Sequence, residues 1–328
     1  MYVIGVDGGG TKTAAVVADT DGHVWAAAEG PGSNPNFVGR EAAFAALRRV
    51  IGEVLAGARA AGCETDSDAA GWRLARAALC VPGLRGCERE AVEAAGLPLD
   101  RVVFDSDTLS TFYGALCRET GLIALAGTGS FVFGANESGA TARAGGWGPV
   151  IGDAGSGQMI AVRALQAVGL EHDERGPATL LTDRVLRRYG VPDAHALKSA
   201  VRLDNVSKLT YIVREAADEG DATAQAILAE AGCALAEMAA DVAARLGMAN
   251  SACEVALAGG LPRIGERYTR PFEERLAERC PAASVVRPLL PPVGGALLLA
   301  LREYGIPWSD EVIERLRTTW VTIGEPNT

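Results

Sequence analysis

The sequence predicts an α/β protein made of two duplicated domains that face a shared cleft. The first observation is length, because 328 residues exceed the roughly 150 residues of an average domain. The second is a repeated order of elements. A strand, a glycine turn, a strand, a polar turn and a third strand begin at Tyr2 and again near Gly121. The third is the 40 glycines, about 12% of the chain against roughly 7% in an average protein.

The first repeat is read from apolar alternation and from the turns between the apolar runs. Strands are expected at 2–6, 13–18, 23–28, 77–81 and 102–104. A long helix is predicted from residue 40 to about 61, because four apolar side chains recur on one face. These are Phe44, Leu47, Ile51 and Leu55. Another helix is expected to begin near Thr108.

The second repeat starts with strands at 122–126 and 131–134, and the chain then continues through a polar turn towards Arg143. Two later strands are expected at 254–258 and 284–287. The remainder is predicted to be helical. The expected helices are 157–168, 178–189, 206–218, 222–246, 264–278, 293–304 and 310–319.

Charge and composition exclude several classes of function. The formal net charge is −10 and no basic run occurs, so we expect no nucleic-acid partner. The seven cysteines form no CxxC pair, which is typical of reduced thiols in a cytoplasmic protein, and the three histidines lack metal-site spacing. The chain opens directly into a strand and has no apolar run long enough to cross a membrane. We therefore expect a cytoplasmic protein without a membrane partner.

The segment from Asp7 to Thr13 reads DGGGTKT and is the first motif with chemistry. Gly8, Gly9 and Gly10 let the backbone turn tightly and direct N–H groups at an anion. A carboxylate before them suits a hydrated magnesium ion beside a phosphate. The motif is not a Walker A loop, since Thr11 separates the last glycine from Lys12, and it is not GxGxxG. An ordinary hairpin turn is the alternative interpretation.

Two other glycine turns follow predicted strands. Gly127, Thr128 and Gly129 form the corresponding turn of the second repeat, and two such turns can bind one polyphosphate from both sides of a cleft. Gly259 and Gly260 suit close backbone approach to a flat ring, although a left-handed turn explains them equally well locally.

Two aspartates flank Ser106 between a strand and a helix. One interpretation is that Asp107 caps the helix. The other is a general base that accepts a proton from a hydroxyl attacking a γ-phosphate. The residues alone leave both roles open and do not choose between Asp105 and Asp107.

A further segment, GGWGPVIGDAGSG, has six glycines in thirteen residues and directly precedes a predicted helix. Its Asp153 and the following serine can cap that helix or face a polar ligand. Trp147, if exposed among these glycines, is typical of a platform for a sugar face, and the alternative is a buried core side chain.

Taken together, DGGGTKT, Asp107 followed after twenty residues by GTGS, GGWGPVIGDAGSG and ALAGGL resemble the N-acetylglucosamine kinase branch of the BadF/BadG/BcrA/BcrD ATPase family. That family belongs to the sugar kinase, heat-shock chaperone and actin superfamily. The resemblance implies duplicated ribonuclease H-like (actin-like ATPase) domains with a cleft between two lobes. The expected lobes are 1–117, completed by a C-terminal helix at about 305–328, and 118–304.

The resemblance also implies ATP and Mg²⁺ as cofactors and assigns residues to them. Asp107 matches the catalytic base, which leaves Asp105 as the lesser candidate, and Asp7 would hold the magnesium ion through water. The ATP-binding residues would be Gly8, Gly9, Gly10, Thr11, Lys12, Thr13, Gly127, Thr128, Gly259 and Gly260. The sugar-binding residues would be Asn34, Gly129, Trp147 and Asp153.

The implied reaction is the phosphorylation of N-acetylglucosamine at its 6-hydroxyl by a homodimer. Glucosamine, N-acetylmannosamine or N-acetylmuramic acid are alternative acceptors, since Pro149 after GGWG can reshape the sugar pocket. Another alternative is the ATP-driven activator of a 2-hydroxyacyl-CoA dehydratase type enzyme, which holds an iron–sulfur cluster through cysteines. The scattered cysteines, with no glycine-flanked pair, count against it.

Overall fold

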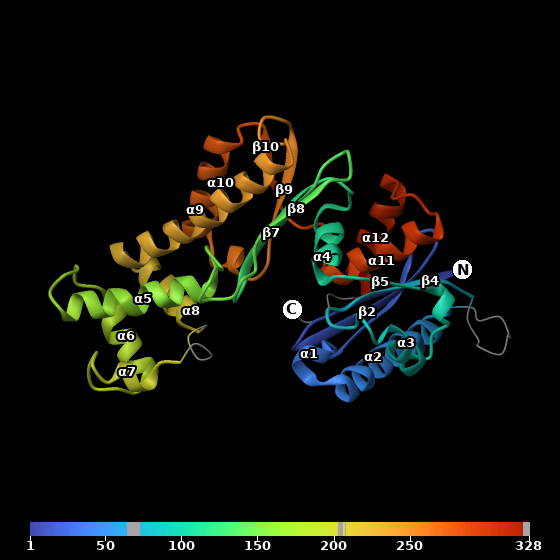
Figure 1. Cartoon of the computed structure of the whole chain (residues 1–328), viewed down its shortest axis with the longest axis horizontal. Helices are drawn as coiled ribbons and strands as arrows, with labels where there is room; N and C mark the ends of the chain where they lie inside the picture. The colour runs from blue at the N-terminus through green and yellow to red at the C-terminus, as the bar shows by residue number, and fades with distance from the viewer. Residues whose placement is uncertain (64–72, 203–205, 207, 324–328) are drawn as a thin grey trace. The chain divides into compact units, whose positions relative to one another are not determined.

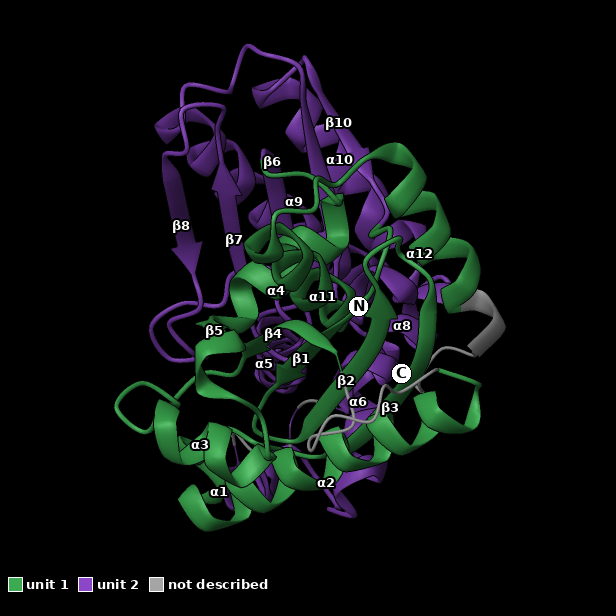
Figure 2. Cartoon of the chain, turned by 90° about the vertical axis from the view of Figure 1, so that its right-hand side faces the viewer, with its two compact units in different colours: residues 1–119, 288–328 green, residues 120–287 purple. Residues whose placement is uncertain are grey.

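The computed structural model describes residues 1–63, 73–202, 206 and 208–323. The chain divides into two compact units (Figure 2). Unit 1 comprises Met1–Glu119 and Pro288–Thr328, and unit 2 comprises Thr120–Arg287. Among the described residues, no helix has the length and hydrophobicity to span a membrane.

Unit 1 (Figure 1) is built on a five-stranded mixed sheet with the strand order β3-β2-β1-β4-β5, whose strands are labelled in Figure 2. The first three strands form an antiparallel meander, and β4 and β5 run parallel to β1. Their bounds are β1 (Tyr2–Gly8), β2 (Lys12–Asp19), β3 (Val24–Pro31), β4 (Leu74–Cys80) and β5 (Val102–Asp105). The helices are α1 (Pro35–Val38), α2 (Arg40–Ala60), α3 (Glu88–Ala95), α4 (Asp107–Leu116), α11 (Pro292–Tyr304) and α12 (Asp310–Ile323), with a 3-10 turn at Leu99–Arg101.

The long helix α2 confirms the amphipathic face that the sequence predicts. Leu47 and Ile51 are fully buried in the core against the sheet, and Phe44 and Leu55 pack partly buried beside them. Burial of this face against β2 and β3 stabilises the helix, whose outer side carries charged residues.

Unit 2 repeats the same sheet, with the strand order β10-β9-β6-β7-β8. Three antiparallel strands again come first, and two parallel strands join the opposite edge. The bounds are β6 (Gly121–Ala126), β7 (Ser130–Ala135), β8 (Thr141–Gly145), β9 (Cys253–Ala258) and β10 (Ala283–Val286). The helices are α5 (Gly157–His172), α6 (Leu180–Tyr189), α7 (Leu197–Ala200), α8 (Leu209–Asp218), α9 (Ala222–Arg245) and α10 (Glu266–Arg279), with a 3-10 turn at Leu261–Ile264. The predicted α/β fold class and its duplicated order of strands are thus confirmed.

The boundary of the last segment differs from the prediction. The sequence places residues 288–304 in the second lobe, whereas they belong to unit 1, where α11 packs on β1, β4 and α4. Glycines permit this packing. A Cβ on Gly5 would lie 2.4 Å from the Leu297 backbone nitrogen, and one on Gly295 would lie 1.8 Å from the Ser110 carbonyl oxygen. Small side chains thus bring α11 into contact with both β1 and α4.

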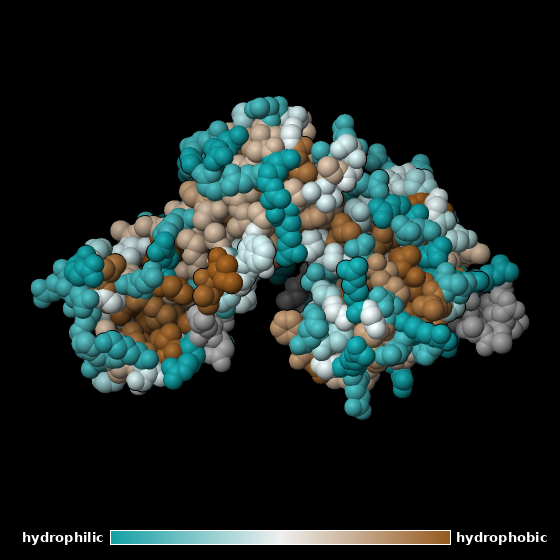
Figure 3. Space-filling view, in the orientation of Figure 1, coloured by the Kyte–Doolittle hydropathy of each residue, from teal (hydrophilic) through white to brown (hydrophobic). Residues whose placement is uncertain are grey.

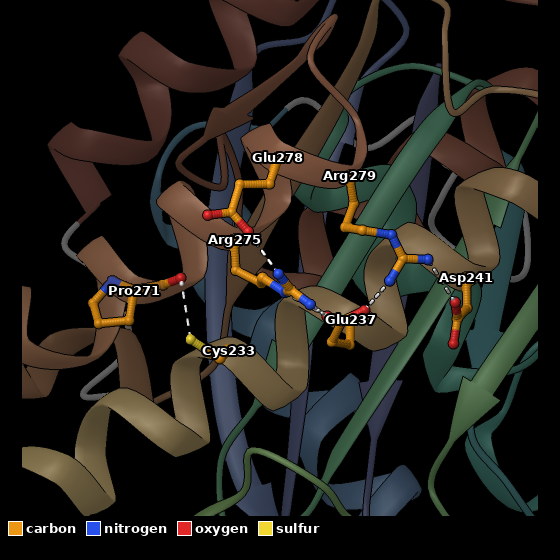
Figure 4. A network of polar contacts seen from close by, with 7 residues as sticks. All are labelled: Cys233, Glu237, Asp241, Pro271, Arg275, Glu278 and Arg279. Carbon is orange, nitrogen blue, oxygen red and sulfur yellow. Dashed lines mark hydrogen bonds and ion pairs between the residues drawn. The ribbon is translucent and has the colours of Figure 1, made fainter.

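A network of charged side chains joins α9 to α10 at the surface of unit 2 (Figure 4). Arg275 and Arg279 both pair with Glu237, and Arg279 lies 3.5 Å from Asp241. All four groups are partly exposed, so each pair contributes little to stability by itself. The network therefore orients two helices whose contact is mainly buried apolar surface.

The surface of the molecule is mainly hydrophilic in the view of Figure 3, with a hydrophobic area over the region of α5 to α7. Leu170 of α5 and Leu180 of α6 are among the exposed large apolar side chains.

Candidate active site

Each unit carries a glycine turn between its first two strands, and polar residues gather around it. The first glycine turn is residues 9–11, between β1 and β2, and the second is residues 127–129, between β6 and β7.

The first glycine turn is held by the loop that follows β3. The Gly9 N–H donates to the Lys12 carbonyl at 2.9 Å, and the Gly9 carbonyl accepts from the backbone N–H groups of Ser33 and Asn34 at 3.0 and 3.1 Å. A Cβ on Gly32 would lie 2.2 Å from the Gly10 carbonyl oxygen, so this loop crosses the turn at close range. The backbone of the turn is therefore fixed before any ligand arrives.

Thr13 lies on the inner side of this arrangement. Its side chain is fully buried, its hydroxyl donates to the Pro31 carbonyl at 2.8 Å, and it lies 2.8 Å from the Ser33 hydroxyl. A Cβ on Gly8 would lie 2.2 Å from the same Ser33 oxygen. Thr13 therefore braces the turn from within, whereas Thr11 is exposed at its tip.

Lys12 forms an ion pair with Glu29 on the neighbouring strand β3, and both side chains are partly exposed. The ammonium group is thus kept beside the glycine turn. A cation in this position can contact an anion bound at the turn, because three N–H donors leave room for partners besides one carboxylate.

Asn34 is the N-cap of the short helix α1, and its Oδ1 accepts from the Asn36 N–H at 3.0 Å. The side chain is 6% exposed. Gly83 adopts a left-handed φ of +86°, and a Cβ there would lie 2.8 Å from Asn34 Oδ1. A polar amide is therefore held in a buried position between the first glycine turn and the loop after β4.

Asp7, Cys80 and Asp105 form a row across the carboxyl ends of three parallel strands. Cys80 pairs in register with Asp7 on one side and Asp105 on the other. The pKa of the Asp7 carboxyl is raised to about 7, mainly by burial and to a smaller extent by nearby Asp107, against the opposing effects of a hydrogen bond from Ser110 and the charge of Lys12. Burial and the three surrounding carboxylates hold the pKa of the Cys80 thiol well above its ordinary value.

The two candidate bases differ in their surroundings. Asp105 Oδ1 accepts from the Ser106 N–H at 2.7 Å, so this half-buried carboxylate serves the local backbone. Asp107 is exposed and is the first residue of α4. The interpretation that Asp107 caps the helix is wrong, because Ser106 is the N-cap and its hydroxyl accepts from the Leu109 N–H at 3.3 Å. Asp107 is therefore the carboxylate that is exposed beside Asp7.

The second glycine turn is closed by hydrogen bonds to the start of α5. The Gly127 N–H donates to the Gly129 carbonyl at 2.9 Å. The N–H groups of Gly157 and Gln158 donate to the carbonyls of Gly127 and Thr128 at 2.9 and 3.2 Å. The first N–H groups of α5 are thus used to hold the turn, so an anion in this unit would bind the turn and not the helix end.

Asp153 lies against the second glycine turn in a left-handed conformation with φ of +60°. It is 5% exposed, and a Cβ on Gly129 would lie 2.8 Å from its Oδ2. The adjacent Ser130 hydroxyl donates to the Ala154 carbonyl at 2.7 Å. Strain in a non-glycine residue is typical of functional positions, and here it directs a buried carboxylate at Gly129.

Trp147 is exposed, as the platform interpretation requires. Its loop folds back on itself, since the Gly152 N–H donates to the Gly148 carbonyl at 2.9 Å, and Val150 and Ile151 are exposed beside it. An apolar surface therefore lies in the same loop as the buried Asp153.

Gly259 and Gly260 follow β9 but have different requirements. Gly259 has φ of +96°, and a Cβ on it would lie 2.2 Å from the Ala126 carbonyl, so the fold itself requires glycine there. Gly260 has ordinary dihedral angles, and a Cβ on it would meet open space. Only Gly260 is left to be explained by a ligand.

Two hydroxyls of this region are absent from the sequence-based prediction, Ser33 and Ser110. Ser110 is fully buried, donates to Asp7 Oδ1, and lies 2.9 Å from the Asp107 carbonyl. Its position three residues after Asp107 in a helix was the available signal, because residues at that spacing share a face.

The residues of unit 1 fit a hydrated magnesium ion. Within the described part of the chain, no group of three or more His, Cys, Asp or Glu side chains could enclose a metal. Asp7 and Asp107 are nevertheless close enough for their charges to interact, and both offer the oxygen atoms that Mg²⁺ prefers. A cation bound through water, with further ligands from phosphate, would relieve the repulsion between these carboxylates.

Comparisons with known proteins agree on the family. A model of the BadF/BadG/BcrA/BcrD ATPase family matches residues 4–300. The chain is 29% identical over 315 residues to an N-acetyl-D-glucosamine kinase of Dictyostelium discoideum, with 91% of this chain and 97% of that protein covered. It is also 29% identical over 317 residues to an N-acetylmuramic acid/N-acetylglucosamine kinase of Clostridium acetobutylicum, with 92% and 99% covered.

A solved structure supports the same relationship. The crystal structure of a candidate N-acetylglucosamine kinase from Chromobacterium violaceum aligns with a TM-score of 0.68 and 28% sequence identity. The alignment covers 92% of this chain and 98% of that one. The similarity therefore extends over both units.

Proposed function

Because the chain belongs to the BadF/BadG/BcrA/BcrD ATPase family, we propose that it is an ATP-dependent kinase that phosphorylates the 6-hydroxyl of N-acetylglucosamine. One observation carries the proposal. Asp107, an exposed carboxylate, is the first residue of α4 and lies near Asp7. Asp7 is near the end of β1, the strand that leads into the first glycine turn. This arrangement combines a proton acceptor, a cation site and an anion-binding turn, which are the parts that phosphoryl transfer requires.

In this proposal Asp107 accepts the proton of the attacking sugar hydroxyl. Asp7 holds Mg²⁺ through water, and the ion when bound neutralises charge on the phosphates. Phosphates would be bound by Gly8, Gly9, Gly10, Thr11 and Lys12, together with Gly127 and Thr128 of the second turn. Thr13 would support the phosphate-binding turn and not contact the phosphates, because its buried hydroxyl donates a hydrogen bond to the Pro31 carbonyl. Gly260, and the backbone at Gly259, would approach adenine and ribose.

The sugar-binding role is proposed for four residues that differ in character. Asn34 and Asp153 offer buried polar groups that can hydrogen-bond hydroxyls or an amide. Gly129 allows close approach beside Asp153, and exposed Trp147 offers a flat apolar face. A sugar presents both kinds of surface, which supports this division of roles.

A second acceptor, N-acetylmuramic acid, is favoured by one relative that is named as a kinase for both sugars. Glucosamine and N-acetylmannosamine remain alternatives on the same scaffold. The activator of a dehydratase gains no support from the cysteines. Six of the seven are buried, and burial raises the pKa of Cys63, Cys80, Cys87, Cys117, Cys253 and Cys280. Protonated, buried thiols do not suit an iron–sulfur cluster shared between subunits.

The experiment is an ADP-release assay with ATP and Mg²⁺ across N-acetylglucosamine, N-acetylmuramic acid, glucosamine, N-acetylmannosamine and glucose. We expect N-acetylglucosamine to give the highest kcat/KM, and NMR of the product to show phosphorus coupled to the C6 protons. Omission of Mg²⁺ should abolish turnover. Absence of turnover with every sugar would overturn the proposal.

The base is tested by a matched pair of substitutions. Asp107→Asn should reduce kcat by roughly 10²–10⁴ with little change in ATP binding, because only proton transfer is lost. Asp105→Asn changes a carboxylate two residues away and should reduce kcat far less. Equal losses in the two variants would contradict the assignment. The proposal also includes a homodimer that is located in the cytoplasm. Light scattering on the purified protein measures whether it is a dimer.

A further inference from the structure

We propose that Ser110 is a positioning residue that fixes the magnesium-binding carboxylate Asp7 relative to the catalytic base Asp107, an inference that rests on the proposed kinase function. Ser110 lies on α4 and its side chain is fully buried. Its hydroxyl donates to Asp7 Oδ1, which comes from β1 and is separated from it by more than a hundred residues of sequence. The same α4 carries Asp107 as its first residue. One side chain therefore joins the elements that supply both carboxylates.

The single hydroxyl proton decides which contact matters. Ser110 Oγ lies near Asp7 Oδ1 and also 2.9 Å from the Asp107 carbonyl oxygen, but a serine has only one proton to donate. The Asp107 carbonyl has a second donor, because the Thr111 hydroxyl donates to it at 2.7 Å. The Asp7 carboxylate is the stronger acceptor of the two, so the proton of Ser110 is donated to Asp7.

The neighbours of Asp7 across the strand ends offer no strong hydrogen-bond donor that could orient its carboxylate in place of Ser110. Its neighbours across the strand ends are the Cys80 thiol and, beyond it, Asp105. A thiol is a weak donor, and the nearby Asp107 carboxylate opposes the charge of Asp7. A hydrogen bond to an ionised group is about twice as strong as one between neutral groups, so the bond from Ser110 defines the rotamer of Asp7.

The position of Ser110 also makes this contact stiff. Gly114 of α4 lies next to α11, and α11 packs so closely that a Cβ on Gly295 would lie 1.8 Å from the Ser110 carbonyl. The backbone of Ser110 is thus in close contact with α11. The backbone that carries the hydroxyl can therefore shift only if α4 moves against α11.

The test compares Ser110→Ala with Thr111→Val. Each variant removes one buried hydroxyl from the same turn of α4, and both hydroxyls contact the Asp107 carbonyl, but only Ser110 contacts Asp7. Ser110→Ala should lower kcat about tenfold and raise the Mg²⁺ concentration for half-maximal rate about tenfold, as expected for the loss of one hydrogen bond to a charged group. The sugar KM should not change. Thr111→Val should match the wild type in all three quantities.

A second measurement does not depend on turnover. Calorimetric titration of each protein with ADP, with and without Mg²⁺, gives the factor by which the metal strengthens nucleotide binding. This factor should fall in Ser110→Ala and remain unchanged in Thr111→Val, while the two variants melt at similar temperatures. Wild-type kinetics and metal dependence in Ser110→Ala would overturn the inference. Equal losses in both variants, which indicate a general packing defect, would also overturn it. A wild type without sugar-dependent turnover would instead refute the kinase proposal.

Discussion

The substitution Gly9→Ala separates the needs of the fold from the needs of a ligand. A Cβ on Gly9 would have the Lys12 carbonyl at 3.8 Å as its nearest neighbour, which is ordinary van der Waals contact, and its φ lies outside the left-handed region. The folded protein therefore tolerates alanine there. A compatible glycine-to-alanine change stabilises a protein by about 0.4–1 kcal/mol through the unfolded chain, so the melting temperature should stay equal or rise slightly.

We expect Gly9→Ala to weaken the binding of ATP. If the Gly9 backbone approaches the phosphates, the added methyl group occupies their space, and overpacking of one methyl costs about 1–3 kcal/mol. This corresponds to a rise of roughly 5–150-fold in the KM for ATP. The sugar KM should change little. Both constants come from the ADP-release assay with the other substrate saturating.

Gly52→Ala is the matched control. Gly52 lies within α2, where a Cβ also meets open space, and this variant should keep the wild-type KM for ATP. Gly32→Ala is unsuitable for the test, since its Cβ would lie 2.2 Å from the Gly10 carbonyl and disturb the turn itself. An unchanged KM for ATP in folded Gly9→Ala would refute close phosphate approach at this turn.

Three further substitutions test other parts of the structure. Trp147→Ala should raise the sugar KM far more than the ATP KM, and equal effects would argue against a sugar platform. The Asp221 carboxylate caps α9 and accepts hydrogen bonds from the backbone N–H groups of Ala224 and Leu180. Burial raises the pKa of this carboxyl, but the hydrogen bonds lower it by more, so its pKa lies below the ordinary value. A lowered pKa adds stability above about pH 4 that is lost as the pH falls through the folded-state pKa. In urea unfolding, Asp221→Asn should therefore cost about 1–3 kcal/mol at pH 7 and less below pH ~4, and a constant difference would contradict this. Gly295→Ala should cost about 3 kcal/mol or more in the same measurement, because its Cβ would overlap the Ser110 carbonyl, and wild-type stability would refute the close α4–α11 contact.

Most elements could be predicted from the sequence because their patterns are local. The helix from Arg40 to Ala60 was predicted within one residue, since its apolar face repeats over many turns. Short elements were missed for the opposite reason. Helix α3 (Glu88–Ala95) and the four-residue helices α1 and α7 have too few turns to show a periodicity. Residue 207, near the start of the helix predicted at 206–218, lies outside the described residues.

The candidate site was predictable only where a motif is continuous in sequence. The glycine turns after β1 and β6 and the segment around Asp153 are of this kind. The choice between Asp105 and Asp107 as the exposed carboxylate was not, because it depends on which residue starts α4 and which one caps it. Ser33 and Ser110 carry no motif and become visible only through their contacts with Thr13 and Asp7.

Local patterns in the sequence are enough to predict the duplicated α/β units, the glycine turns and the chemical groups near them, because hydrophobic period and turn chemistry are local properties of the chain. The folded structure is needed to see which glycines the fold requires, that α11 belongs to unit 1, and that Ser110 joins Asp7 to the helix of Asp107. These facts depend on close contacts between segments far apart in sequence. Such contacts are determined by how segments pack in the folded chain, and the identity of a single residue does not show them.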